Sequence, residues 1–217
     1  MKKAVIFDMD GTLWDTSYVI KECWNKLGQK IFGPNFHLTL NDIRSQMGKT
    51  MDQILESVLP CGVTKEQVEE FSSTFLGFEL DYINDNHPGK LYPKEKETFK
   101  KLTEMGYEVY IVSNCQKGYL EAYLKAYPEC AKYVKGILCW GDTGLPKRGT
   151  IRQIIQDHNI DKAIYVGDTS FDEIETRGAN LPFIFASYGF GTPIDPDETI
   201  YSLEELPNKA KKYLEEN

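Results

Sequence analysis

Long apolar runs, a cysteine framework and clustered histidines are all missing from this sequence of 217 residues. The five cysteines are an odd number with no CxxC pair, which argues against a disulfide framework and against a zinc site. No apolar run approaches the ~20 residues of a transmembrane helix. Asp8 and Asp10 interrupt the apolar start too early for a signal peptide. We therefore expect a cytoplasmic protein with no membrane partner.

An excess of positive charge is missing as well. The formal net charge is -8, and acidic and basic residues are interleaved along the chain. Nucleic-acid backbones are held mainly by clustered Lys and Arg side chains, so we expect no nucleic-acid partner. The short basic segment 209–212 is explained as the end of a last helix, where cations suit the helix dipole. The composition is that of a globular protein, and the oligomeric state is left open, with a monomer as one option.

Short apolar runs recur along the chain and predict the strands of a parallel sheet. The strongest runs, each ending at a polar or glycine residue, are 4–7, 109–112 and 163–166, and two weaker ones are 136–139 and 183–186. Segments with helical periodicity separate them, at 95–105, 119–126, 148–159 and 171–178. Alternating strands and helices imply a sheet covered on both faces. We therefore predict an α/β fold with a Rossmann-like parallel sheet, whose ligand binds beyond the carboxyl ends of the strands.

The segment 16–87 has a different pattern, because it contains helical periodicity and no convincing strand. Its candidate helices are 17–32, 40–47, 51–58 and 64–82. Such a segment between the first strand and the rest predicts an inserted α-helical domain, while residues 1–15 and 88–217 form the α/β core. The turn-forming residues 85–89 would be the return linker.

The segment Asp8-Met9-Asp10-Gly11-Thr12 follows the first strand directly. Residues two apart in an extended chain project to the same side, so both carboxylates can face one site. Such a pair suits phosphoryl transfer: one carboxylate attacks phosphorus, and the other protonates the leaving oxygen and then activates water. Gly11 permits a tight turn that brings backbone N–H groups to a phosphate. The alternative is a polar turn that merely ends the strand.

Other polar residues follow the later strands or open a helix. Asp168 and Asp172 come directly after the third strong strand, and carboxylate oxygens are ligands that Mg²⁺ prefers. Ser113 and Asn114 offer a hydroxyl and N–H donors to phosphate oxygens. Lys147 opens a helix, where a cation is unfavourable beside the positive end of the dipole, and this position indicates an anionic partner. Each residue has an ordinary alternative in a turn, a cap or the surface.

Taken in order, these residues resemble the four motifs of the haloacid dehalogenase superfamily, which read DxDGT, Ser/Thr, Lys and GDxxxD. The resemblance implies that Asp8 is the nucleophile and a magnesium ligand. It implies that Asp10 is the general acid/base, with its main-chain carbonyl on the metal. Asp168 would be a further magnesium ligand, and Lys147 would neutralise charge on the nucleophile and the phosphate. The other site residues expected to bind substrate or to support these groups are Gly11, Thr12 (which would help to orient Asp10), Ser113, Asn114 and Asp172 (which would hold Lys147 or a metal-bound water).

The inserted helices resemble the small α-helical cap of this superfamily, which closes over the substrate. Within it, segment 48–50 lies between helices, and Lys49 is the candidate for contact with the substrate. The loop 188–191 is similar to one in the phosphoglycolate-phosphatase-like branch, whereas residues 173–180 are more charged than the family's usual small-residue helix. The implied activity is that of a magnesium-dependent phosphatase, acting on a small phosphorylated metabolite through an aspartyl-phosphate intermediate.

Members of the superfamily with other activities define the alternatives. Asp10 favours phosphoryl transfer over dehalogenation. A sugar phosphomutase would need cationic residues in the cap, where Arg44 and Lys49 are clustered. A phosphonate hydrolase would need a Schiff-base lysine in the cap, and the candidates are Lys21, Lys26, Lys30 and Lys49. A non-catalytic module that binds magnesium and phosphate is the alternative from a different class.

Overall fold

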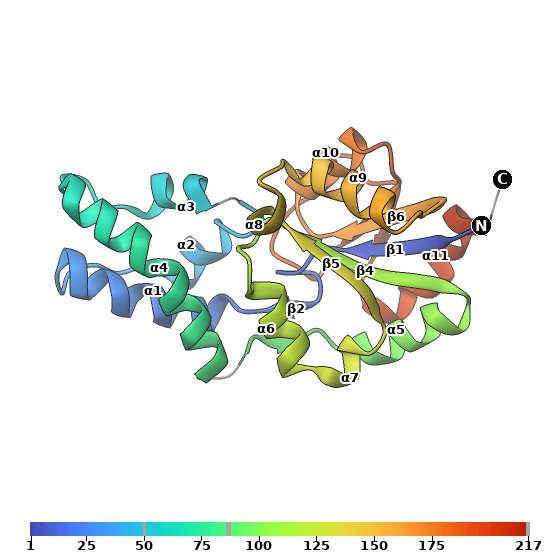
Figure 1. Cartoon of the computed structure of the whole chain (residues 1–217), viewed down its shortest axis with the longest axis horizontal. Coiled ribbons are helices and arrows are strands. Elements are labelled where there is room, and N and C mark those ends of the chain that lie inside the picture. The colour runs from blue at the N-terminus through green and yellow to red at the C-terminus, as the bar shows by residue number, and fades with distance from the viewer. Residues whose placement is uncertain (50, 86–87, 216–217) are drawn as a thin grey trace.

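The computed structural model describes residues 1–49, 51–85 and 88–215, and Figure 1 shows a sheet flanked by helices with a second group of helices to one side. Three parts of the predictions lie outside the described residues, namely Thr50 of the expected substrate-contact segment, residues 86–87 of the expected linker and residues 216–217 of the expected core. No helix in the described part of the chain is long and apolar enough to cross a lipid bilayer.

Parallel strands form the central sheet, in the order β5-β4-β1-β6-β7-β8. Their bounds are β1 (Lys3–Phe7), β4 (Tyr107–Ser113), β5 (Val134–Cys139), β6 (Lys162–Gly167), β7 (Phe183–Ala186) and β8 (Glu198–Ile200). β1 pairs with β4 on one side and with β6 on the other along its whole length. The carboxyl ends of these three strands therefore meet at one edge. The predicted α/β fold is confirmed, and β8 is an additional strand, too short and too polar to be predicted.

Helices cover both faces of the sheet (Figure 1). Val5 and Phe7 of β1 belong to one hydrophobic cluster, and Ala4 and Ile6 belong to another, because alternate residues of a strand face opposite sides. Helices α5, α6 and α11 contribute to the first cluster and α9 to the second. The helices of this part are α5 (Glu95–Glu104), α6 (Tyr119–Ala126), α7 (Pro128–Ala131), α8 (Trp140–Thr143), α9 (Lys147–Asp157), α10 (Ser170–Gly178), the 3-10 helix η1 (Leu203–Glu205) and α11 (Leu206–Glu215).

In the described part of the chain, four further helices form the helical insert, which lies beside the carboxyl edge of the sheet (Figure 1). They are α1 (Ser17–Phe32), α2 (Leu40–Arg44), α3 (Met51–Val58) and α4 (Lys65–Asp85). α1 packs on α4 through aromatic side chains, with the ring centroids of Trp24 and Phe75 5.0 Å apart. α1 and α3 have the predicted bounds, whereas α2 is shorter than the predicted 40–47 and α4 begins and ends later than the predicted 64–82.

The chain leaves and re-enters the core through a two-stranded antiparallel ribbon. β2 (Trp14–Asp15) pairs with β3 (Lys90–Leu91), with Trp14 opposite Leu91. A Cβ atom at Gly89 would lie 2.7 Å from the carbonyl oxygen of Asp15, so this close approach requires glycine. The predicted division into a core of residues 1–15 and 88–217 and an insert of residues 16–87 has its boundaries beside this ribbon, and it stays a prediction.

Candidate active site

The turn after β1 positions the first two carboxylates. The N–H of Asp8 donates to the carbonyl oxygen of Val166 at 2.8 Å, so the chain continues beside β6 for one residue beyond the strand. Gly11 then has φ 86°, in the left-handed region. A Cβ atom on Gly11 would lie 2.2 Å from Oδ2 of Asp168, so glycine at this position lets the turn approach the carboxylate that follows β6.

Lys147 is buried between two carboxylates. Its Nζ donates to Oδ1 of Asp8 at 2.7 Å and to Oδ1 of Asp172 at 2.5 Å. The side chains of Lys147 and Asp172 are fully buried, and that of Asp8 is 3% exposed. Burial alone would lower the pKa of Lys147, but the charges of Asp172 and Asp8 outweigh it and hold the pKa well above its usual value. Lys147 is therefore a positive charge at the end of β1 with two carboxylate partners, in agreement with the anionic partner that its position at a helix start indicated.

Three carboxylates converge at the same place. Asp8, Asp168 and Asp172 each offer an oxygen, and these oxygens lie within 4.8 Å of one another. Burial, and then the charge of Asp172, raise the pKa values of Asp8 and Asp168 above their usual range. Buried carboxylates of like charge favour a cation between them, and oxygen ligands at this spacing fit a hard divalent ion such as Mg²⁺. Asp172 thus joins the cluster as well as holding Lys147.

Asp10 is bound by different hydroxyl groups from the one expected. Its Oδ1 accepts hydrogen bonds from Thr16 Oγ1 at 2.7 Å and from the Tyr119 hydroxyl at 2.8 Å. Thr12 was expected to orient Asp10, but its hydroxyl donates to Oδ1 of Asp168 at 3.2 Å, because the turn directs it toward the end of β6. Burial raises the pKa of Asp10 to about 6, and the bonds from Thr16 and Tyr119 partly offset this rise.

The residues expected to hold phosphate meet the helical insert. Ser113 ends β4 and is almost fully buried, as is Asn114. The side-chain amide of Asn114 donates to the carbonyl oxygen of Gly48 at 2.8 Å, so this residue connects the core to the loop between α2 and α3. Lys49, in the same loop, donates to Oε1 of Gln46 at 3.0 Å.

A cavity of about 60 Å³ lies between the core and the insert. It is lined from the core by Asp8, Asp10, Ser113, Asn114, Cys115, Gln116 and Tyr119, and from the insert by Ile20, Trp24, Gln46, Met47, Gly48, Lys49, Ile54 and Glu79. A larger hollow of about 530 Å³ lies against α2, α3 and the start of α10, and Met47, Gly48 and Lys49 line both spaces. The loop 47–49 therefore separates the carboxylates from the larger hollow.

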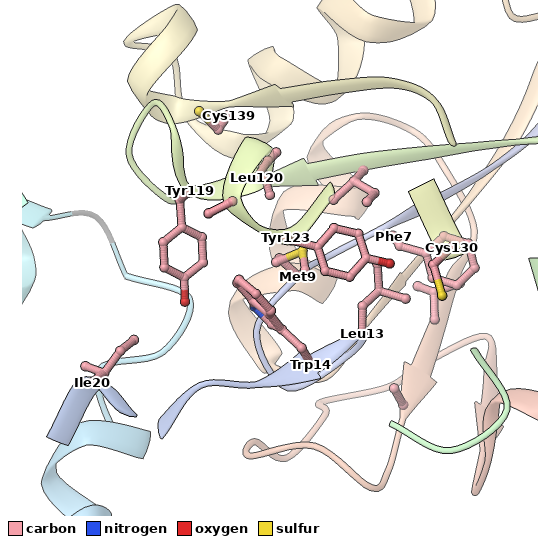
Figure 2. Packing of buried hydrophobic residues seen from close by; sticks show 14 of the residues in the cluster. Phe7, Met9, Leu13, Trp14, Ile20, Tyr119, Leu120, Tyr123, Cys130 and Cys139 are labelled. Atoms are coloured by element: carbon pink, nitrogen blue, oxygen red, sulfur yellow. The ribbon is translucent and has the colours of Figure 1, made fainter. Parts of the chain in front are cut away.

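Several residues of the site were not predicted from sequence. Tyr119 stands at the start of α6, where its ring packs edge-on against Trp14 with centroids 5.2 Å apart. Figure 2 shows its hydroxyl directed toward the side on which Ile20 lies. Tyr165, in the middle of β6, donates to the carbonyl oxygen of Val112 at 2.8 Å and lies 3.5 Å from Oδ1 of Asp8. A tyrosine in an apolar run carries no sequence signal that distinguishes these contacts from ordinary core packing.

Comparisons with known proteins find similar proteins along most of the chain. The model of a family described as haloacid dehalogenase-like hydrolase matches residues 5–186. The phosphoglycolate phosphatase of Rhodobacter capsulatus is 27% identical over 97% of this chain and 92% of its own length. That of Vibrio parahaemolyticus is 25% identical over 94% of each chain.

Solved structures share the fold. A haloacid dehalogenase-like hydrolase from Bacteroides fragilis has a TM-score of 0.81 and 22% identity, covering 95% of this chain and all of that one. A protein from Haemophilus somnus, described as a predicted phosphoglycolate phosphatase, has a TM-score of 0.84 and 20% identity, covering 96% of this chain and 97% of its own. The sheet and the helical insert are thus found together in both proteins.

Proposed function

Because the chain belongs to the haloacid dehalogenase-like hydrolase family, we propose that it is a magnesium-dependent phosphatase that hydrolyses a small phosphate monoester through an aspartyl-phosphate intermediate. It is an enzyme, and it is similar to phosphoglycolate phosphatases over nearly its whole length. One observation carries the proposal: Lys147 contacts both Asp8 and Asp172 within a cluster that includes Asp168. The substrate we propose is a cytoplasmic phosphorylated metabolite.

The first step belongs to Asp8. Its carboxylate attacks phosphorus, so that a carboxylate–phosphorus bond forms while the bond from phosphorus to the leaving oxygen breaks. Asp10, which lines the same cavity, gives its proton to the leaving oxygen. The raised pKa of Asp10, about 6, keeps a useful fraction protonated near neutral pH. Lys147 offsets the negative charge that Asp8 and the phosphoryl group bring together.

The second step reverses the role of Asp10. Its carboxylate, now deprotonated, takes a proton from a water molecule that attacks the phosphorus of the aspartyl-phosphate. The acyl phosphate bond breaks, inorganic phosphate leaves, and Asp8 regains its carboxylate. The hydrogen bonds from Thr16 and Tyr119 hold Asp10 in position for both proton transfers.

We propose residues that hold a divalent cation and the substrate phosphate. Asp8, Asp168 and Asp172 would hold Mg²⁺, and the main-chain carbonyl of Asp10 is the further ligand that we propose. When bound, Mg²⁺ supplies positive charge that polarises the phosphoryl oxygens. We propose that Ser113, Asn114 and the turn at Gly11 and Thr12 bind those oxygens, that the helical insert is the cap, and that Lys49 contacts the substrate.

Turnover of p-nitrophenyl phosphate with Mg²⁺ tests the proposal. Asp8→Asn removes the attacking group and is expected to lower kcat by at least about 10³-fold. Asp157→Asn, the same change at an exposed position on α9, is the matched control and should retain full turnover. Far-UV circular dichroism checks that both variants fold. Retained activity in Asp8→Asn would remove this residue from its proposed role.

Asp10→Asn separates the two steps. p-Nitrophenolate leaves without help from an acid, so the variant should release one equivalent per enzyme in a rapid burst and then turn over slowly. Burst kinetics with p-nitrophenyl phosphate measure this, and steady turnover at the parent rate would argue against Asp10 as acid and base. Chelation of the metal by EDTA should abolish turnover in the parent, and added Mg²⁺ should restore it.

The contacts of Arg44 and Lys49 bear on the alternative functions, namely a phosphomutase and a phosphonate hydrolase. Arg44 forms an ion pair with Asp15 at 3.0 Å and donates a hydrogen bond to Ser17. Of the two clustered cations that a phosphomutase would need for the second phosphate, only Lys49 is then without a carboxylate partner among the described residues. Lys49 is also the one candidate Schiff-base lysine that lines the cavity among the described residues. Release of phosphate from phosphonoacetaldehyde would favour the phosphonate hydrolase. Inactivity toward all small phosphate esters would favour the binding module.

A further inference from the structure

A buried glutamate from the insert lines the cavity that contains Asp8 and Asp10. Glu79 lies on α4 and is 7% exposed. Its Oε2 accepts a hydrogen bond from the indole N–H of Trp24 at 2.7 Å. No hydrogen bond to Oε1 is found within the described residues, and this oxygen is not one of their fully buried side-chain atoms without a partner. A carboxylate oxygen of a residue that lines the cavity can accept a hydrogen bond from a bound ligand.

Glu79 lines the insert side of the cavity, where the leaving group of a substrate bound at Asp8 would lie. The phosphoryl group must reach Asp8 at the core side, so the rest of a monoester extends toward the insert. On that side the cavity has an apolar wall, which includes Ile20, Met47 and Ile54. Lys49 is the only cation among the described residues that line this cavity, and one N–H of its ammonium group donates to the neutral side chain of Gln46.

The charge of the cavity disfavours a second anionic group on the substrate. Asp8, Asp10 and Glu79 are acidic against the single cation of Lys49, and Lys147 is engaged with Asp8 and Asp172. A carboxylate at the far end of the substrate would face Glu79, and like charges brought together in a buried site are repelled strongly. A hydroxyl or an ammonium group would instead donate to Glu79.

We propose that Glu79 selects the leaving group, so that the preferred substrates are small phosphate monoesters ending in a hydroxyl or an ammonium group and not in a carboxylate. This inference rests on the proposed phosphatase function. It sets the chain apart from the substrate for which its relatives are named, phosphoglycolate, whose leaving group carries a carboxylate. Glu79 is a specificity residue and takes no part in the transfer of the phosphoryl group.

Three esters of the same length test the proposal, since they differ only in the end group: 2-phosphoglycolate, 2-hydroxyethyl phosphate and 2-aminoethyl phosphate. The values of kcat/KM are measured with Mg²⁺ at pH 8, where Glu79, whose pKa burial raises to about 7, is mostly ionised. For the parent enzyme we expect the hydroxyethyl and aminoethyl esters to exceed phosphoglycolate by at least roughly 10-fold. This comparison needs no variant.

Glu79→Gln removes the charge and keeps an oxygen that can accept from Trp24. It should raise kcat/KM for phosphoglycolate relative to 2-aminoethyl phosphate by roughly 10-fold or more. Glu70→Gln, at an exposed position on the same helix, is the matched control and should leave all three ratios unchanged. Rates with p-nitrophenyl phosphate normalise the amount of active enzyme.

The outcomes separate the two hypotheses. A parent enzyme that prefers phosphoglycolate, or ratios that do not move in Glu79→Gln, would overturn the role of Glu79 while the phosphatase function stands. No turnover of any ester, including p-nitrophenyl phosphate, would overturn the phosphatase function and the inference with it. A reversal of preference confined to Glu79→Gln would establish the inference.

Discussion

Glu95 is a buried carboxyl group outside the cavity, and replacing it by glutamine should stabilise the protein. It opens α5, is 1% exposed and accepts a hydrogen bond from the Tyr123 hydroxyl. Its Oε2 is buried with no hydrogen-bond partner. Burial raises the pKa of Glu95 from 4.5 to about 8, an effect that the side chains of Tyr123 and Cys130 only partly offset. The folded protein therefore disfavours the ionised form that the unfolded chain prefers at neutral pH.

The magnitude follows from the difference between the two pKa values. Because the pKa is higher in the folded state, the stability linked to protonated Glu95 is fully present below pH 4.5 and is lost as the pH rises through about 8. At pH 7 the loss is about 3 kcal/mol, at ~1.4 kcal/mol for each pH unit above 4.5. Glu95→Gln cannot ionise and keeps an acceptor for Tyr123. Its free energy of unfolding at pH 7 should exceed the parent value by up to about 3 kcal/mol, a rise of roughly 6–12 °C in Tm.

Urea unfolding of the parent and of Glu95→Gln from pH 4 to pH 9 measures this effect. The other buried carboxyl groups are present in both proteins, so the difference between the curves reports Glu95 alone. That difference should be small at pH 4, grow through neutral pH and level off above pH 8. Glu97→Gln, at an exposed position on α5, is the control and should follow the parent. A variant less stable than the parent at pH 8 would refute the reasoning, as would a difference that does not change with pH.

Three further predictions concern the candidate active site. Lys147→Met leaves Asp8 and Asp172 without their shared cation, so turnover of p-nitrophenyl phosphate should be lost, and urea unfolding at pH 8 should show a loss of about 3–5 kcal/mol in stability. Tyr119→Phe removes a hydrogen bond that lowers the pKa of Asp10, so that pKa should rise above about 6, and the alkaline limb of kcat/KM against pH should move to higher pH. Mg²⁺ at ~100 times its Kd should raise the free energy of unfolding of the parent by about 3 kcal/mol, and calorimetry should find little such gain in Asp168→Asn.

Residues that follow a strand could be predicted from the sequence. Asp8, Ser113 and Asp168 each follow an apolar run, and parallel pairing of β4, β1 and β6 brings the ends of those runs to one edge. Lys147 could be predicted because a cation at a helix start is unusual enough to indicate an anionic partner. The predicted strands and helices are present for the same reason, since their periodicity is a local property of the chain.

Residues whose role depends on packing between distant elements could not be predicted from the sequence. Glu79 reaches the cavity because α4 packs along α1, and the sequence of an exposed-looking helix does not specify that register. Arg44 is a cation of the insert in sequence, yet its pairing with Asp15 becomes visible only when α2 is placed beside the ribbon. The ribbon itself was missed because two-residue strands have no periodicity.

The ribbon between β2 and β3 also bears on how this architecture can vary. Trp14 and Leu91 lie side by side, so the chain leaves the sheet and returns to it at neighbouring points, and the helices α1 to α4 lie between them in sequence. Such an insert can be lengthened, shortened or exchanged without changing the register of the central sheet. Mutations in the insert can therefore change the part of the cavity that the insert lines, while the carboxylates at the strand ends keep their spacing. Related proteins can therefore differ in the phosphate esters that they prefer and still use the same reaction at the strand ends.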